Sequence, residues 1–220
     1  MSLRADRNIL QAVVSLPSPR LEGKVSLEET VVRRRSVRRY RREPLQLSQL
    51  SQILWSAQGI TGSRRLRAVP SAGATYPLDV FVVVGEQGVI AGESKQTPEK
   101  LQPGIYHYEA DSHALSLHKA GDLRQDLARA SLNQEFIMDA PVDIILCALY
   151  HRTCRRYGKR GERYVHMEIG HAGQNIHLQA VALGLATAEV GAFRDEELRE
   201  VLGLEDQIKP LYMMPVGKAL

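Results

Sequence analysis

The chain has 220 residues, of which 44% are hydrophobic and 25% charged. The length is sufficient for a buried hydrophobic core, and the composition excludes global disorder. No apolar run approaches the roughly 20 residues of a membrane span, and Cys147 and Cys154 alone provide no disulfide framework, so we expect a cytoplasmic protein with reduced thiols. The net charge is +4, yet seven arginines fall within residues 33–42, and the rest of the chain would carry −3. This basic cluster predicts an anionic ligand, with a phosphate or a nucleic acid as candidates.

Residues 1–25 contain two prolines and little hydrophobic periodicity, so we expect an N-terminal arm before one domain that spans residues 26–220. Ser26 and Glu29 have the spacing of a capping box, which predicts a helix that begins near Leu27 and continues toward the arginines. The basic residues would then lie at the carboxyl end of this helix, where the helix dipole favours cations.

Apolar spacing and runs of branched residues predict the remaining elements. A helix over residues 45–57 would have Ser48 as its N-cap and Gly59 as its stop. Buried strands are predicted at residues 80–84 and 142–149, because apolar residues follow one another there. Further elements are a hairpin of residues 105–108 and 115–118, helices over residues 123–130, 164–183 and 195–202, and strands near residues 186–190 and 211–216. Helices and strands mix without regular alternation, which favours an α+β fold.

The helix predicted over residues 164–183 contains Gly170 and Gly173, each of which costs about 1 kcal/mol relative to alanine. This cost indicates close packing against another helix, which an oligomer interface would explain. The polar residues of the other face are expected to be exposed: Glu168, His171, Gln174, Asn175 and Gln179. His166 and His171 lie about 140° apart around the helix axis, so no metal site is expected from this pair.

The sequence contains no Rossmann fingerprint, no P-loop and no nucleophile motif of the common hydrolases. Two positive signals remain. The segment 34–38 (Arg-Arg-Ser-Val-Arg) offers guanidinium forks and a hydroxyl to a phosphate, with a solvated helix end as the alternative interpretation. The small residues of segment 70–77 would let the backbone approach a flat ligand, with an ordinary turn before a strand as the alternative.

Six segments, taken in chain order, resemble the flavin-dependent nitroreductase superfamily, and most of all its SagB-type (azoline-oxidase-like) dehydrogenases. They are residues 34–40, 70–77, 139–144, 170–176, 190–193 and 215–218. The resemblance implies an α+β, nitroreductase-like sandwich with a central, mostly antiparallel sheet flanked by helices. It also implies an intertwined homodimer that binds FMN at the subunit interface.

By this resemblance, the FMN phosphate and ribityl chain would contact Arg34, Arg35 and Ser36. Arg38 would lie near the N1/O2 edge of the flavin, where reduction deposits negative charge. Lys218 is the candidate that would complete the phosphate site near the last residue of the sequence.

The resemblance also assigns residues to the flavin ring. A loop of the partner subunit would lie along the isoalloxazine, and its residues are Pro70, Ser71, Ala72, Gly73 and Ala74. The side chain of Asn133 or Gln134 would contact the ring. The backbone N–H groups of Gly191 and Ala192 would point toward N5 and O4.

The resulting interpretation is an FMN-dependent oxidoreductase that passes hydride through the flavin N5. A nitroreductase would take hydride from NAD(P)H and reduce a small organic substrate, whereas a SagB-type dehydrogenase would oxidise an azoline-like substrate. The second reaction needs a base, for which Tyr157, Lys159 and Tyr164 are candidates, although a basic surface loop is the alternative interpretation.

Two functions of other classes compete with this interpretation. The first is a nucleic-acid-binding protein that uses the cluster Arg33–Arg42, but Tyr40 is the only aromatic residue within it, which leaves few groups for bases to stack on. The second is a protein that binds FMN without catalysis. The sequence leaves open the substrate, the reaction direction and the choice between NADH and NADPH.

Overall fold

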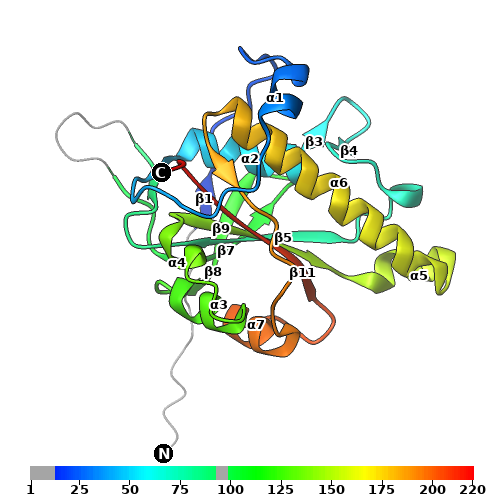
Figure 1. Cartoon of the computed structure of the whole chain (residues 1–220). Helices are drawn as coiled ribbons and strands as arrows, with labels where there is room; N and C mark the ends of the chain where they lie inside the picture. Colours follow the sequence, from blue (N-terminus) through cyan, green and yellow to red (C-terminus); the bar gives the residue numbers. More distant parts are fainter. Residues whose placement is uncertain (1–12, 93–98) are drawn as a thin grey trace, which may run out of the picture.

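A central antiparallel sheet organises the molecule. The computed structural model describes residues 13–92 and 99–220. The strands of the sheet are β1 (Val13–Ser15), β5 (Leu78–Val84), β7 (Gly104–Glu109), β8 (Ala114–Ala120), β9 (Val142–Ala148), β10 (Ala186–Thr187) and β11 (Lys209–Gly217). Within the described residues their order is β1-β8-β7-β5-β9-β11-β10, and each neighbouring pair is antiparallel (Figure 1). This arrangement confirms the predicted α+β class and the predicted sheet.

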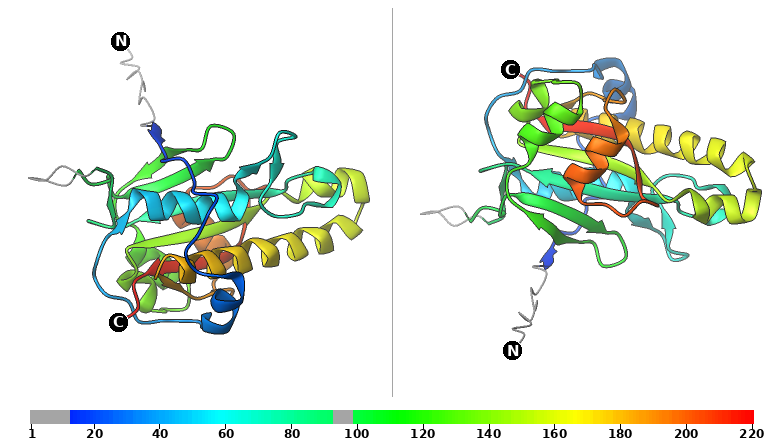
Figure 2. Two further views of the ribbon diagram at one scale, coloured as in Figure 1. Left: turned by 90° about the horizontal axis from the view of Figure 1, so that it is seen from above. Right: turned by 90° about the horizontal axis from the view of Figure 1, so that it is seen from below.

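Helices cover both faces of this sheet. They are α1 (Leu27–Arg33), α2 (Leu47–Gln58), α3 (Arg124–Ala130), α4 (Phe136–Asp139), α5 (Tyr150–Tyr157), α6 (Arg160–Ala182) and α7 (Asp195–Leu202). Short accessory strands are β2 (Leu45–Gln46), β3 (Ile60–Thr61), β4 (Leu66–Arg67) and β6 (Val89–Ile90). Figure 2 shows α2 and α6 over one face and α3, α4 and α7 over the other.

Strand β5 separates the two halves of the core. Val80 and Val82 pack in the cluster beneath α2 and α6, whereas Phe81 and Val83 pack in the cluster on the opposite face. Because both faces are buried, the strand has a continuous apolar sequence without polar alternation. The strand predicted at residues 80–84 is therefore confirmed.

The start of α2 differs from the prediction. The helix begins at Leu47, so the expected N-cap Ser48 lies inside the first turn. The Gln49 side chain caps the start of the helix, because its Oε1 accepts a hydrogen bond from the Gln46 N–H at 2.9 Å. The predicted stop is confirmed, since the Gly59 N–H donates to the Trp55 carbonyl oxygen at 2.8 Å.

The segment preceding α1 is more closely attached to the domain than its composition indicated. Residues 13–15 form β1, which pairs with β8, and Leu16 is buried. The Ser51 hydroxyl also donates to the Pro17 carbonyl oxygen at 2.6 Å. The predicted arm therefore includes an edge strand, and its residues 1–12 lie outside the described residues.

Helix α5 is not predicted by the sequence, which indicates no helix between the strand of residues 142–149 and the helix of residues 164–183. Helix α6 also begins at Arg160, earlier than the predicted start at residue 164. Gly161 permits this arrangement, since a Cβ on it would lie 2.9 Å from the Cys154 backbone. The two helices therefore pack closely at a position where a larger residue would push them apart.

Within residues 13–92 and 99–220, none of the helices is long and apolar enough to cross a membrane. In the same residues, His, Cys, Asp and Glu side chains form no group of three that could hold a metal ion. Cys147 is buried in β9 and Cys154 is half-buried in α5, and both are free thiols.

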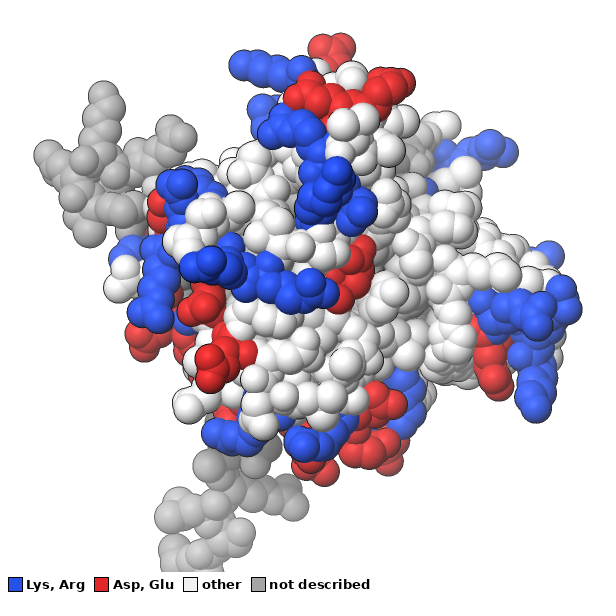
Figure 3. Space-filling view, viewed as in Figure 1, with Lys and Arg blue, Asp and Glu red and all other residues white. Residues whose placement is uncertain are grey.

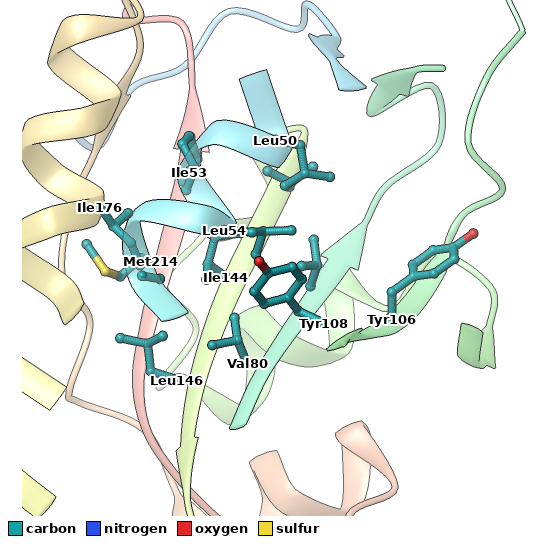
Figure 4. Packing of buried hydrophobic residues seen from close by; sticks show 14 of the residues in the cluster. Leu50, Ile53, Leu54, Val80, Tyr106, Tyr108, Ile144, Leu146, Ile176 and Met214 are labelled. Carbon is teal, nitrogen blue, oxygen red and sulfur yellow. The ribbon is translucent and has the colours of Figure 1, made fainter. Parts of the chain in front are cut away.

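The packing of α2 on the sheet predicts a large effect of core truncation. Leu54 is fully buried among Leu50, Val80 and Ile144 (Figure 4). We expect Leu54→Ala to lower the free energy of unfolding by about 2–5 kcal/mol, because it leaves a cavity in the core. Leu66→Ala, at an exposed position in β4, is the control and should change it by roughly 0.5 kcal/mol or less. Urea denaturation measures both values, and equal effects would contradict this account of the core.

Candidate functional site

The arginine segment is held on the last strand of the sheet by its backbone. Ser36 bridges to Thr187 of β10, and the Val37 N–H donates to the Thr187 carbonyl oxygen at 2.9 Å. Tyr40 is buried, and its hydroxyl donates to the carbonyl oxygens of Val37 and Pro215. These contacts fix the backbone and leave most of the arginine side chains at the surface.

The arginines differ in their pairing with carboxylates. Arg33, Arg41 and Arg42 form ion pairs with acidic side chains, at 2.7–3.8 Å. The other arginines of the cluster form no ion pair within the described residues, and they are Arg34, Arg35, Arg38 and Arg39. Figure 3 shows basic side chains gathered over α1 and the segment that follows it. Four unpaired guanidinium groups on a fixed backbone form a surface that suits an anion.

A second group of predicted residues lies beside this segment. The Arg38 guanidinium stacks over the Phe136 ring, 5.8 Å from its centroid. Gln134 lies two residues before Phe136, and its amide donates to the Ala192 carbonyl oxygen at 2.9 Å. Gln134 therefore positions the loop after β10, while Asn133 is exposed with a left-handed backbone at φ 59°.

The loop that contains Gly191 and Ala192 is held on both sides. The Val190 N–H donates to the Met213 carbonyl oxygen, and the Arg194 N–H donates to the Ala130 carbonyl oxygen. Between these anchors, the N–H groups of Gly191 and Ala192 donate to no acceptor within the described residues, and both residues are exposed. The loop therefore presents two fixed donors beside the arginines.

Near the arginine segment, His177 and Glu189 form a pair that is not among the predicted site residues. His177 is buried in α6, and its Nε2 lies 3.0 Å from the Glu189 carboxylate. Burial raises the pKa of Glu189, but the His177 hydrogen bond and the nearby charges of His177 and Arg34 outweigh burial and hold the pKa below its usual value. Glu189 precedes the segment 190–193 that carries the family resemblance, whereas no sequence pattern distinguishes His177.

Lys218 is on the same side of the molecule but is already paired. Its ammonium group donates to the Glu43 carboxylate at 2.6 Å, and this hydrogen bond is the main reason that the pKa of Glu43 lies below its usual value. The predicted contact of Lys218 with a phosphate would have to share its ammonium group with Glu43 or replace this ion pair.

The segment Pro70–Ala74 lies elsewhere, against α5. The Arg156 guanidinium donates to the Gly73 carbonyl oxygen at 3.2 Å, and the hydroxyls of Thr75 and Thr153 are 2.7 Å apart. Gly73 has a left-handed backbone, and a Cβ there would lie 2.5 Å from the Tyr157 hydroxyl. The segment is thus near the start of α6, whereas the arginines are near its end (Figure 2). One chain does not bring the two groups of predicted residues together.

Helix α6 contradicts one expectation and leaves another open. Glu168 was expected at the surface but is only 3% exposed, whereas His171 and Gln174 are exposed as predicted. A Cβ on Gly170 would meet nothing, and one on Gly173 would meet the Tyr212 ring at 3.4 Å. The close helix–helix contact predicted for these glycines does not occur within the described chain, and an oligomer interface stays a prediction.

The Glu168 carboxyl has few partners in its buried position. Its Oε1 has no hydrogen-bond partner among the described residues, and neither does the nearby Gln58 Nε2. Burial raises the pKa of Glu168 to about 7, although the hydroxyl of Ser71 and the amide of Gln58 partly offset it. The carboxyl therefore changes charge near neutral pH.

A central antiparallel sheet with helices on both faces is the architecture of the nitroreductase fold. The chain belongs to the Nitroreductase family, whose sequence pattern matches residues 31–218. It is 44% identical over 196 residues to the "Putative nitroreductase MJ1384" of Methanocaldococcus jannaschii, covering 89% of this chain and 92% of that protein.

Two solved structures have the same fold. A "putative nitroreductase" from Ralstonia eutropha superposes with a TM-score of 0.79 and 28% identity, covering 94% of this chain and 90% of that one. A chain of the Escherichia coli microcin synthetase McbBCD complex superposes with a TM-score of 0.69 and 25% identity, covering 82% of this chain and 67% of that one. The second likeness agrees with the resemblance to SagB-type dehydrogenases.

The buried carboxyl makes stability depend on pH. The folded protein holds the Glu168 proton up to pH about 7, whereas the unfolded chain releases it near the ordinary value of 4.5, so ionisation of this group lowers stability as pH rises between these values. Glu168→Gln removes the titration. We compare the free energy of unfolding of the variant with that of wild type at each pH. This difference, variant minus wild type, should be larger at pH 8 than at pH 5 by roughly 1–3 kcal/mol.

Urea denaturation at the two pH values measures this difference. Glu162→Gln, at an exposed position of α6, is the control and should give no such dependence. A difference between Glu168→Gln and wild type that stays constant with pH would contradict the raised pKa.

Proposed function

We propose that this protein is an FMN-dependent oxidoreductase. The observation that carries the proposal is the set of unpaired guanidinium groups in segment 34–39, fixed beside the free N–H donors of Gly191 and Ala192. When bound, the flavin supplies a hydride acceptor and donor at N5. The rest of the chemistry depends on how the chain binds and surrounds it.

The arginine segment fits the phosphate end of FMN. Arg34 is half-buried and Arg35 is exposed, and each carries donors in a planar fork. The next residue, Ser36, is exposed and offers a hydroxyl. A hydrogen bond to a charged group contributes about 1.5–3 kcal/mol, so two or three of them would hold a phosphate firmly. Relief of the repulsion among these guanidinium groups would add to this affinity.

The other donors fit the ring. Arg38 is held over Phe136 and would place positive charge near the N1/O2 edge, where it stabilises the negative charge of the reduced form. The N–H groups of Gly191 and Ala192 would donate toward N5 and O4. Gln134 contributes indirectly, because it holds the Ala192 carbonyl oxygen.

The position of the loop Pro70–Ala74 supports a site shared by two subunits. This loop lies at the opposite end of α6 from the arginines, so it can cover a flavin only if a second copy of the chain supplies it (Figure 2). The uncovered Gly170 and the exposed Met167 of α6 provide surface for such a contact. We therefore propose a homodimer with two equivalent sites.

The substrate is proposed as a small organic molecule, and the reaction direction has two versions. In the nitroreductase-like version, NAD(P)H donates the hydride and an electron-poor organic molecule accepts it. In the SagB-type version, an azoline-like ring is oxidised. The Tyr157 hydroxyl lies next to Gly73 of the loop, which makes it the nearest of the predicted bases, while Tyr164 packs edge-on against it.

Binding of a nucleic acid is disfavoured as the function. Tyr40 is the one aromatic residue inside the cluster Arg33–Arg42, and it is buried with its hydroxyl bonded to two carbonyl oxygens. It is therefore unable to stack on a base, which is how proteins usually hold single strands.

The phosphate assignment predicts which substitutions release FMN. We expect purified protein to be yellow, or to become so on incubation with FMN. Replacing Arg34 and Ser36 together by alanine should weaken FMN binding by about 100-fold, because two contacts to the phosphate are lost. Arg42→Ala is the control, since that side chain is 90% exposed and pairs with Asp139.

Fluorescence titration with FMN measures the affinities. A colourless protein that takes up no FMN would overturn the proposed function. Equal affinities in the double variant and wild type would overturn the assignment of the phosphate site alone.

Anaerobic mixing with NADH and with NADPH distinguishes the versions of the proposal. We expect one of the two dinucleotides to bleach the visible flavin absorption, as a nitroreductase requires. Bleaching by neither, in a protein whose flavin is still reduced by dithionite and reoxidised by an organic acceptor, would favour the dehydrogenase. A flavin that reacts with no donor or acceptor would indicate a protein that binds FMN without catalysis.

A further inference from the structure

A group of exposed cations lies at the hairpin where α5 turns into α6. Figure 3 shows basic side chains gathered at the end of the molecule where Figure 1 places α5. Within the described residues, no member of this group forms an ion pair, and the one carboxylate of the hairpin, Glu162, is exposed as well. We call the group the hairpin cations, and its members are Arg155, Arg156, Lys159, Arg160 and Arg163.

The positions of these cations are unfavourable for the helix itself. Lys159 is the N-cap of α6 and Arg160 is its first residue, and the dipole of a helix disfavours positive charge at its amino end. Arg163 lies three residues after Arg160 and four after Lys159, which are the spacings at which like charges on a helix repel each other. Helix stability therefore does not explain this cluster, whereas a bound anion would relieve the repulsion.

Contacts between aromatic rings and guanidinium groups fix the shape of the hairpin. The Tyr157 and Tyr164 rings, one from each helix, pack edge-on with their centroids 5.1 Å apart. The Arg156 guanidinium lies over the Tyr157 ring, 5.6 Å from its centroid, and the Arg160 guanidinium lies over the Tyr164 ring at 5.7 Å. A stacked guanidinium presents N–H donors in one plane, which suits a phosphate. Two of the hairpin cations are thus positioned before a ligand binds, which lowers the entropy lost on binding.

Arg156 connects the hairpin with the loop Pro70–Ala74. Its guanidinium donates to the Gly73 carbonyl oxygen at 3.2 Å, and a Cβ on Gly73 would lie 2.5 Å from the Tyr157 hydroxyl. The proposed function assigns this loop to the flavin ring of a second subunit. An anion held by the hairpin cations would therefore lie beside that ring. It would not compete with the FMN phosphate of the same chain, whose arginines are at the other end of α6 (Figure 2).

We propose that the hairpin cations bind the phosphate groups of a dinucleotide hydride donor and favour NADPH over NADH. The inference rests on the proposed function, because it names the donor for that site and the surface that selects it. NADPH differs from NADH by one ribose phosphate, and a phosphate monoester carries a charge of about −1.5 to −2 at pH 7. Unpaired guanidinium and ammonium groups therefore attract NADPH more strongly.

A nucleic acid fits this surface less well. The Tyr157 and Tyr164 rings pack against each other and beneath guanidinium groups, so they offer bases little surface for stacking. The hairpin cations also fall within residues 155–163 alone, whereas a single strand needs a basic groove that follows its backbone.

The test uses full-length protein loaded with FMN. Anaerobic stopped-flow mixing follows the bleaching of the flavin absorption, and its dependence on dinucleotide concentration gives an apparent dissociation constant for each donor. We expect the constant for NADPH to be at least about tenfold lower than that for NADH, because one more phosphate contacts the cations. Calorimetric titration with NADP+ and NAD+, which do not reduce the flavin, measures binding without turnover. The NADP+ affinity should fall as ionic strength rises to about 0.15 M.

Variants that change the charge in opposite directions test the surface. Lys159→Gln combined with Arg163→Gln should raise the NADPH constant by at least about tenfold and the NADH constant by about threefold or less. Glu162→Gln should lower the NADPH constant by roughly two- to threefold. Lys100→Gln combined with Arg129→Gln removes two exposed cations outside the hairpin, and this matched control should leave both constants unchanged. The first variant should also unfold at no lower temperature than wild type, since it removes a repulsion.

The outcomes separate this inference from the proposed function. A preference for NADPH that is lost in Lys159→Gln with Arg163→Gln and kept in the control supports the inference. Equal constants for the two donors, or a preference that this variant retains, would overturn it. A labelled single-stranded oligonucleotide that binds more tightly than NADP+ in fluorescence anisotropy would overturn it as well. If FMN binds but neither donor bleaches it, this inference alone fails. If no FMN binds, the proposed function fails and this inference fails with it.

Discussion

The burial of the central strands on both faces is the constraint on which the structure depends. Strands β5 and β9 are covered by α2 and α6 on one side and by α3 and α7 on the other, and their backbones pair with a neighbouring strand on each side. Because α6 covers one face of these strands, it runs along the sheet. With 23 residues it extends for about 35 Å, and its two ends lie far apart.

The candidate site follows from the position of α6. The unpaired arginines and the free N–H donors of Gly191 and Ala192 gather near its carboxyl end, while the loop Pro70–Ala74 rests on α5 near its amino end. A single chain therefore carries two separate half-sites. A second copy related by a two-fold axis is the simplest arrangement that joins one half to the other, and it would also cover the exposed face of α6.

Electrostatics distinguishes the two half-sites. At the carboxyl end, positive charge lies at the surface without partners, which suits an anion that arrives from solution. At the amino end, the important group is a carboxyl that is kept from water and from cations, so its charge depends on pH. The two ends of α6 therefore differ in electrostatic character: the carboxyl end has exposed positive charge, whereas the amino end combines exposed cations with a buried carboxyl.

Much of the fold could be read from the sequence because it is encoded locally. The apolar run at residues 80–84 predicts a strand buried on both faces, and the periodicity and acidic start of residues 195–202 predict α7. Helix α5 was missed because its sequence is almost wholly polar. Its single buried residue, Thr153, contacts Thr75 from a distant part of the chain. No local pattern records such a contact.

The sequence by itself determined the arginine cluster, the order of the family's motifs and the class of fold, because these depend on residues that are close together in the chain. Only the tertiary structure decided that Lys218 is paired with Glu43, that the predicted site residues form two groups, and that Glu168 is buried. A helical pattern shows which residues share a face but not what covers that face. Here burial in the folded chain, which the helical pattern does not record, raises the pKa of Glu168 to about 7 at what looks like an ordinary polar position on α6.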